Sequence, residues 1–76
     1  HGRLIYADTP LPVVAADIAR YSGKRVEVDS TLRQRVFSGV LVVEEGPQML
    51  ANLADLMAIA CVETGDHYSL RAAGGR

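Results

Sequence analysis

The sequence has little of several residue types, and each shortage excludes a class of protein. Cysteine occurs once in 76 residues, so no internal disulfide can form and a disulfide-stapled mini-protein is excluded. The 8 Lys and Arg nearly balance the 9 Asp and Glu, so no excess of positive charge favours nucleic acid. No apolar run approaches the ~18 residues of a membrane span, and no signal peptide opens the chain. We therefore expect a soluble module, which is compatible with a piece of a longer membrane protein.

Residues suited to catalysis or metal binding are also scarce. The two histidines are His1, at the terminus, and His67, in an expected turn. Nucleophilic catalysis needs a base within hydrogen-bond reach of a Ser or Cys, and a metal site needs several converging ligands. Asp66 beside His67 is the one local pair of this kind, and a solvated turn explains it better. Gly39 and Gly46 are isolated, so no glycine-rich phosphate loop is present. The sequence predicts no catalytic, metal-binding or cofactor-binding site. We therefore expect that the protein is not an enzyme.

The adjacent pair Glu44 and Glu45, and the single Cys61, also carry groups that can take part in chemistry, but both have structural explanations. Glu44 and Glu45 are adjacent after a predicted strand, so their side chains point different ways, and we expect them to favour the positive end of the helix that follows. Cys61 lies within the apolar run 59–62 and is expected to be a small buried hydrophobe rather than a nucleophile.

What the sequence does contain is a pattern that occurs twice. A strand, a helix and a strand run from Leu4 to Val28 and again from Phe37 to Glu63. A shift of 35 positions superimposes apolar and proline positions of the two copies: Pro12 on Pro47, Ile18 on Leu53, Tyr21 on Leu56 and Val26 on Cys61. A duplicated scaffold without an evident active site indicates a binding module. We expect one domain over residues 1–76, with its core in about 3–72 and a linker at Gly74–Arg76.

The predicted order of elements is β-α-β-β-α-β-β. Asp8 or Thr9 could cap the first helix, Pro10 fits its first turn, and Gly23 is suited to end it. The strands that follow are expected at 25–28, 36–43, 59–64 and 68–71, with the second helix starting at Gly46-Pro47. Ser38-Gly39 suggests a bulge or a close backbone approach.

Each helix carries an apolar stripe that needs cover. The expected stripes are Leu11, Val14, Ala15, Ile18 and Tyr21 in the first helix and Met49, Leu50, Leu53, Leu56 and Met57 in the second. Packing the helices together between two small sheets removes both stripes from water. The sequence therefore predicts an α+β fold with two helices sandwiched between two small sheets.

The strand at 36–43 offers the best candidate for a partner-binding surface. If Phe37, Leu41 and Val43 point inward, then Val36, Val40 and Val42 point outward, where a small sheet usually carries polar residues. Either a neighbouring element covers these valines, or they form an apolar edge that accepts another protein by strand addition.

A modest basic stretch precedes this strand, made of Lys24, Arg25, Arg33 and Arg35. Ordinary surface charge is the simplest explanation, followed by a partner-facing patch. RNA binding comes third, because the strands lack the aromatic residues on which bases stack. The residues predicted to bind a partner are Arg33, Arg35, Val36, Val40 and Val42.

Several segments resemble the C-terminal region of FecR-type anti-sigma regulators. They are Gly2-Arg3-Leu4-Ile5-Tyr6, Asp8-Thr9-Pro10-Leu11-Pro12-Val13-Val14, Ala19-Arg20-Tyr21-Ser22-Gly23 and Phe37-Ser38-Gly39-Val40, with the helix around Leu50 and Leu53. The resemblance covers roughly residues 2–72. The chain is similar also to the STN signalling domain of secretins and TonB-dependent transporters. One departure is that Val40 and Val42 are apolar where relatives are often polar.

The resemblance implies a function in cell-surface signalling. FecR-type regulators are anchored in the inner membrane of Gram-negative bacteria and have a periplasmic C-terminal region. That region receives a signal from the N-terminal domain of a TonB-dependent transporter for ferric siderophores or haem, and proteolysis of the regulator then releases a sigma factor. The implied partners are this transporter domain, the rest of the regulator and periplasmic or inner-membrane proteases, with no nucleic acid. The alternative is that the chain is itself the STN domain of a transporter or secretin.

Overall fold

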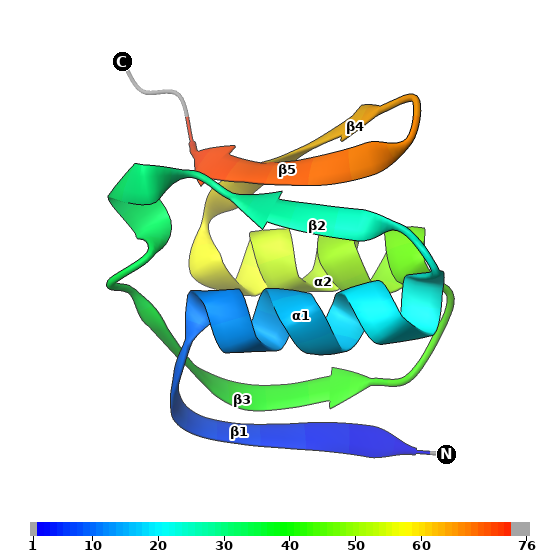
Figure 1. Cartoon of the computed structure of the whole chain (residues 1–76). Helices are drawn as coiled ribbons and strands as arrows, with labels where there is room; N and C mark the ends of the chain where they lie inside the picture. Colours follow the sequence, from blue (N-terminus) through cyan, green and yellow to red (C-terminus); the bar gives the residue numbers. More distant parts are fainter. Residues whose placement is uncertain (1, 74–76) are drawn as a thin grey trace.

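The computed structural model describes residues 2–73, and it confirms the predicted order of strands and helices (Figure 1). His1 and the expected linker at Gly74–Arg76 lie outside the described residues. One short 3₁₀ helix, which was not predicted, lies between the second and third strands. The elements are β1 (Arg3–Pro10), α1 (Leu11–Ser22), β2 (Arg25–Val28), η1 (Ser30–Leu32), β3 (Val36–Val42), α2 (Gly46–Met57), β4 (Ile59–Thr64) and β5 (His67–Ala72).

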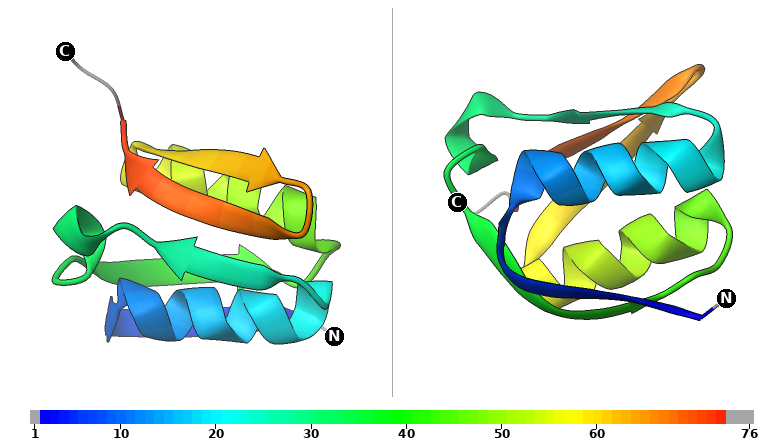
Figure 2. Two further views of the ribbon diagram at one scale, coloured as in Figure 1. Left: turned by 45° about the horizontal axis from the view of Figure 1, so that its top comes forward. Right: turned by 60° about the horizontal axis from the view of Figure 1, so that its bottom comes forward.

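Two small sheets enclose the two helices, as predicted. β1 and β3 form an antiparallel pair, and β2, β5 and β4 form a second sheet in that order. In this second sheet β2 runs parallel to β5, whereas β4 runs antiparallel to it. Figure 1 shows the β1–β3 pair below the helices and the other sheet above them, and Figure 2 shows α1 and α2 side by side between the layers. The fold is therefore α+β, and each sheet takes strands from both copies of the repeated pattern.

The core is a single cluster to which the helices contribute most. The residues of α1 and α2 that face each other and the sheets are almost fully buried, and Phe37 and Leu41 of β3 and Tyr68 and Leu70 of β5 close the cluster from the two sheets. At about 1.5–3 kcal/mol for each large apolar side chain, this burial is the main force that holds the layers together. The buried helix residues are Leu11, Val14, Ala15, Ile18, Met49, Leu50, Leu53, Ala54 and Met57.

The repeat is visible in the environments of equivalent residues. Pro12 and Pro47 both lie in the first turn of their helices, and Ile18 and Leu53 are both fully buried. Val26 and Cys61 are both half-buried against the core. The shift of 35 positions therefore describes a duplication of structure as well as of sequence.

One residue of each predicted apolar stripe was wrong, whereas the other predicted residues, Met57 included, are buried. Tyr21 is 52% exposed and Leu56 is 62% exposed. At 100° per residue, each lies about 80° from the centre of its stripe, which passes through Ser22 and Met57 instead. Tyr21 and Leu56 occupy equivalent positions in the repeat, so the prediction assigned the same exposed helical position to the buried face in both copies.

The start of α1 also differs from the prediction. Neither Asp8 nor Thr9 caps the helix: Pro10 is the N-cap residue and no side chain bonds to the first turn. β1 continues through Pro10 and pairs with Val36, so the strand is longer than the apolar segment at 4–6. At the other end Gly23 adopts the expected left-handed conformation, with φ of 76°, and its N–H donates to the carbonyl of Ala19 over 2.9 Å.

The predicted irregularity near Gly39 is present, but the extra residue is on the neighbouring strand. Between the pairs Tyr6–Gly39 and Thr9–Phe37, two residues of β1 lie opposite one residue of β3. Asp8 takes a positive φ of 49° there, and its N–H donates to Ser38 Oγ over 2.8 Å. Gly39 has φ of 153°, and a Cβ at this position would lie 3.0 Å from the Phe37 ring. The close approach expected at this glycine is therefore its contact with Phe37.

Candidate protein-interaction surface

An apolar surface covers the outer face of the β1–β3 sheet. Val36, Val40 and Val42 are 48%, 44% and 51% exposed, whereas Phe37 and Leu41 between them are buried. The outward orientation predicted for the three valines is therefore confirmed, and no element within residues 2–73 covers them.

Sequence reasoning missed a fourth member of this surface. Ile5 of β1 lies directly opposite Val40 and is 78% exposed, more than any other large hydrophobic residue described. The alternation of exposed Ile5 with buried Tyr6 was the available signal, but the segment is too short to show a period on its own. We call Ile5, Val36, Val40 and Val42 the valine surface.

The backbone of β3 is open along the edge that faces away from β1. Val43 N–H donates to the Gly2 carbonyl over 2.8 Å, and Leu11 N–H donates to the Arg35 carbonyl over 2.9 Å. In an antiparallel pair, alternate residues direct their backbone groups to the partner strand. The even-numbered residues of β3, from Val36 to Val42, therefore direct theirs to the open edge. The same residues carry the exposed valines.

Leu56 of α2 stands beside this open edge. Two shallow hollows run along the edge, one lined by residues from Arg35 to Val40 and the other by residues from Val40 to Val42. Leu56 and Val40 line both hollows. An apolar side chain thus lies where the side chains of an added strand would be placed, next to unpaired backbone groups.

The opposite edge of the sheet is less suited to pairing. β1 carries the bulge at Ala7 and Asp8, and it ends at Pro10, which has no N–H to donate. Bulges and prolines are features that discourage strand addition at an edge. The edge of β3 is the better acceptor of the two.

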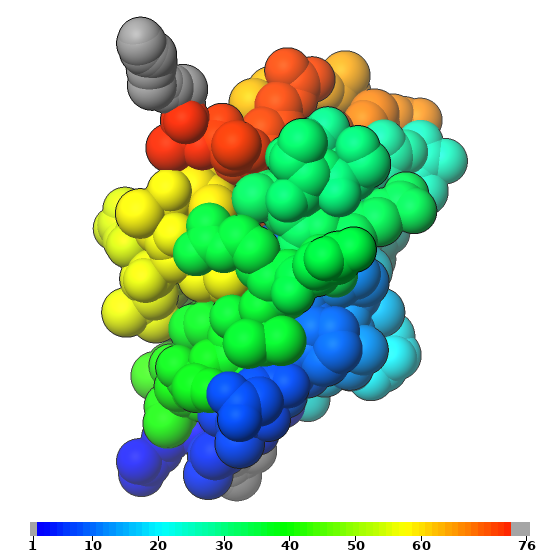
Figure 3. Space-filling view, turned by 90° about the vertical axis from the view of Figure 1, so that its left-hand side faces the viewer, coloured from blue at the N-terminus to red at the C-terminus, as the bar shows by residue number. Residues whose placement is uncertain are grey.

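The two predicted basic residues lie at the start of β3 but in different surroundings. Arg35 lines the first hollow with Val36 and Val40, and its guanidinium donates to the Met57 carbonyl over 3.3 Å. Arg33 follows η1 and lines a separate hollow with Pro12 beside β2. In Figure 3 the segment from η1 to β3, in green, runs along this end of the molecule beside the β1–α1 corner, in blue. Four of the five predicted residues thus border the open edge, and Arg33 stands apart from it.

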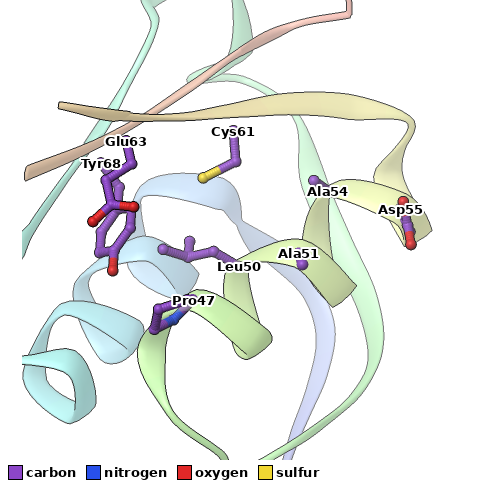
Figure 4. Close-up of a pocket in the computed structure, with 8 residues that line it drawn as sticks. All are labelled: Pro47, Leu50, Ala51, Ala54, Asp55, Cys61, Glu63 and Tyr68. Carbon is purple, nitrogen blue, oxygen red and sulfur yellow. The ribbon is translucent and has the colours of Figure 1, made fainter.

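A second groove lies between α2 and β4 and contains the single cysteine (Figure 4). Cys61 was expected to be buried but is half-buried, and its side chain points into the space above Leu50. At one end of the groove Glu63 accepts a hydrogen bond of 2.9 Å from Lys24, whose ammonium lies 4.8 Å from the centre of the Tyr68 ring. The position equivalent to Cys61 in the first repeat is Val26, which lines a similar hollow beside α1.

We expect the thiol of Cys61 to react slowly. Burial, followed by the nearby charge of Glu63, raises the pKa of Cys61, so less thiolate is present near neutral pH. Alkylation by iodoacetamide at about pH 8 should be at least about tenfold slower in the folded chain than in the same chain in urea. Mass spectrometry of quenched samples measures both rates. Equal rates in the two conditions would contradict this environment for Cys61.

The described residues contain no group suited to hold a metal ion, because no three His, Cys, Asp or Glu side chains converge anywhere in 2–73. His67 begins β5, where Nδ1 lies 3.0 Å from Asp66 Oδ1 and Nε2 lies 3.7 Å from Glu27 Oε1. The hydrogen bond with His67 lowers the pKa of Asp66. Glu45 is the N-cap residue of α2, without a side-chain hydrogen bond to it.

The aromatic residues of the sheets do not form a platform for nucleic-acid bases. Tyr6 donates a hydrogen bond of 2.9 Å to Asp17 and packs against Phe37 with ring centroids 5.8 Å apart, so both rings face the helices. Burial and the Asp17 hydrogen bond raise the pKa of Tyr6 well above its usual value. Tyr68 is also buried. The outer face of the β1–β3 sheet is aliphatic, which disfavours the RNA-binding alternative.

Across residues 2–73, neither helix has the length and apolarity that crossing a membrane requires. Comparison with models of protein families finds no match, and comparison with curated proteins finds none either.

Comparison with solved structures does find similar folds. Two crystal structures of a candidate anti-sigma factor from Parabacteroides distasonis, at 1.65 Å and 2.50 Å resolution, match with TM-scores of 0.79 and 0.80 and 15% sequence identity. Each match covers 95% of this chain and 34% of the other, so this chain spans about a third of that protein. The fold is that of one region of that protein. At this identity the likeness establishes the shared fold, with its two helices between two small sheets.

Proposed function

We propose that this chain is a periplasmic protein-interaction module of a FecR-like regulator of a sigma factor. In this proposal the module receives a signal from the N-terminal domain of a TonB-dependent transporter for siderophores or haem, and the remainder of the regulator is anchored in the inner membrane. The observation that carries the proposal is the valine surface beside the open edge of β3. Two further observations support it: the FecR-like segments over residues 2–72, and the fold shared with a candidate anti-sigma factor.

The mode of binding follows from the chemistry of that edge. A strand of the transporter domain would pair with the free backbone groups of Val36, Val40 and Val42, and its side chains would cover Leu56 on one face and meet the valines on the other. Backbone pairing provides affinity without demanding a fixed partner sequence, whereas the apolar contacts at Leu56 and Val40 provide selectivity.

Signalling by such a module requires that the partner bind one arrangement better than another. A bound strand would extend the β1–β3 sheet and order the start of β3, where Arg35 already contacts the end of α2. Differential binding would then change the access of periplasmic or inner-membrane proteases to the rest of the regulator. No catalytic step by this chain is needed.

Titration of the labelled chain tests the docking surface. The N-terminal domains of the organism's TonB-dependent transporters are added in turn to ¹⁵N-labelled chain, and amide shifts are recorded. We expect one domain to shift amides of β3 and Leu56 first. Val40→Lys should weaken that binding at least about tenfold, because a charge at the centre of an apolar contact must be desolvated.

Val62→Lys is the matched control for this experiment. Val62 is 38% exposed, close to the 44% of Val40, but lies on β4 in the other sheet. The control should bind as the unchanged chain does. If no transporter domain shifts any amide at about 500 µM, a concentration that would reveal even weak complexes, the docking proposal is wrong.

A further inference from the structure

Opposite charges stand at the two ends of β3. Arg33 and Arg35 precede the strand, and Glu44 and Glu45 follow it; all four are exposed. Among the described residues none of these four takes part in an ion pair, whereas Asp17, Glu27, Glu63 and Asp66 each do. Glu44 makes one long hydrogen bond of 3.4 Å with Asn52. The strand is thus an apolar, β-prone segment with a basic start and an acidic end.

An antiparallel neighbour of the same sequence would place these ends against each other. In such a pair the start of one strand lies beside the end of the other, so arginines of each copy would meet glutamates of the other. A parallel neighbour would instead place like charges together. The charge pattern therefore selects a two-fold symmetric arrangement of two copies.

The open backbone groups fix the register of this arrangement. The even-numbered residues of β3 direct their backbone N–H and C=O groups to the open edge of the sheet. Two copies can therefore form backbone hydrogen bonds only with even-numbered residues opposite even-numbered residues. If Val40 of one copy lies opposite Val40 of the other, across the two-fold axis, then Ser38 lies opposite Val42 of the second copy. Arg35 then lies opposite Glu45 of the second copy, and the pair occurs twice.

We propose that this chain associates with a second copy of itself through antiparallel pairing of β3 with β3, centred on Val40, so that the two β1–β3 sheets join into one four-stranded sheet.

The position of Leu56 agrees with the same axis. Leu56 shares both hollows along the edge with Val40, so an axis through Val40 brings the two copies of Leu56 close to each other. Contact between them would bury a side chain that is 62% exposed in the single chain. Self-association thus accounts for two features at once: the charged ends of β3 and the exposed leucine on α2.

The other strand edges lack this complementarity. The edge of β1 is interrupted at Ala7 and Asp8, and β2 has only 4 residues. The edge of β4 has an acidic residue, Glu63, near its end, but no basic residue at its start, where Ile59 and Ala60 lie. Among the strands within residues 2–73, only β3 combines an unbroken edge with opposite charges at its ends.

Exchange of the charges tests the proposal on the chain alone. Sedimentation velocity between about 10 µM and 1 mM should show monomer converting to dimer. Arg35→Glu and Glu45→Arg should each raise the dissociation constant at least about tenfold, because each places two like-charged pairs in the dimer. The double variant R35E/E45R restores both opposite-charge pairs and should return the dissociation constant to within about threefold of the original.

The double variant distinguishes a loss of contacts between the two copies from a loss of folding. Circular dichroism should show the three variants folded, and Leu56→Ala should weaken the dimer independently of charge. A chain that remains monomeric at about 1 mM would overturn the proposal. So would a double variant as weak as the single ones, or a dimer in which hydrogen exchange protects the edge of β4 instead of β3. A second copy and a transporter strand would occupy the same edge of β3, so the two complexes exclude each other. No transporter domain is present in this experiment, so its failure leaves the proposed docking standing, and failure of docking leaves this proposal standing.

Discussion

Leu53→Asp is expected to leave the chain unfolded in buffer without denaturant. Leu53 has no exposed surface and belongs to the buried cluster that joins α2 to the rest of the core. Removing a buried leucine side chain costs about 2–5 kcal/mol before the desolvation of a carboxylate is added. A domain of this size has a total stability of about 3–5 kcal/mol. Far-UV circular dichroism and urea titration measure the result.

Leu56→Asp is the matched control for this prediction. It makes the same substitution on the same helix, one turn away, at a side chain that is 62% exposed. The control should change the free energy of unfolding by no more than about 0.5 kcal/mol. Ile18→Asp, at the position equivalent to Leu53 in the repeat, should unfold the chain as Leu53→Asp does. A folded Leu53→Asp chain, or equal losses at Leu53 and Leu56, would refute the buried stripe.

Gly46→Ala is expected to destabilise the domain by about 1–3 kcal/mol, because it overpacks the point where the start of α2 meets the end of α1. A Cβ at Gly46 would lie 2.3 Å from Ser22 Cβ and 3.3 Å from Ser22 Cα. Neither atom is the far end of a flexible side chain, so the helices must move apart. Urea unfolding of the variant measures the loss.

A double-mutant cycle with Ser22→Gly identifies the cause. Ser22→Gly removes the Cβ that the new methyl group would meet, although it also removes the hydrogen bond of 3.1 Å that Ser22 Oγ accepts from Lys24 N–H. The two substitutions should therefore compensate, with a favourable coupling of at least about 1 kcal/mol. Additive losses would show that Gly46 is required for another reason.

The order of elements could be predicted because the local patterns were strong and agreed with one another. Arg25–Val28 alternates as a half-buried strand, Gly23 ends α1, and Gly46-Pro47 begins α2, all as expected. These features depend on backbone geometry near each residue, so sequence alone carries them.

Features that depend on contacts between distant segments could not be predicted. The bulge was expected at Ser38-Gly39, but the extra residue is on β1, because the register is set by pairing of β3 with a segment about 30 positions away. Pro10 was assigned to a helix and instead ends a strand, since its pairing with Val36 outweighs its preference for a first helical turn. The exposure of Leu56 and Tyr21 depends on which side of each helix meets the other.

The valine surface was predicted in part. The outward valines followed from strict alternation with Phe37 and Leu41, but whether another element covered them was left open. Ile5 was missed, and the neighbouring Leu56 was expected to be buried, because both reach this region from elements that are distant in sequence from β3. Their contribution to this region required the three-dimensional positions of β1 and α2.

The exchange of strands between the repeats has a consequence for the folding of each half. β1 of the first repeat pairs with β3 of the second, and β5 joins β2 of the first to β4 of the second. A lone β-α-β unit of this kind would have no neighbour for its first strand and no cover for its helix. Either half of this chain, separated from the other, is therefore expected not to fold by itself.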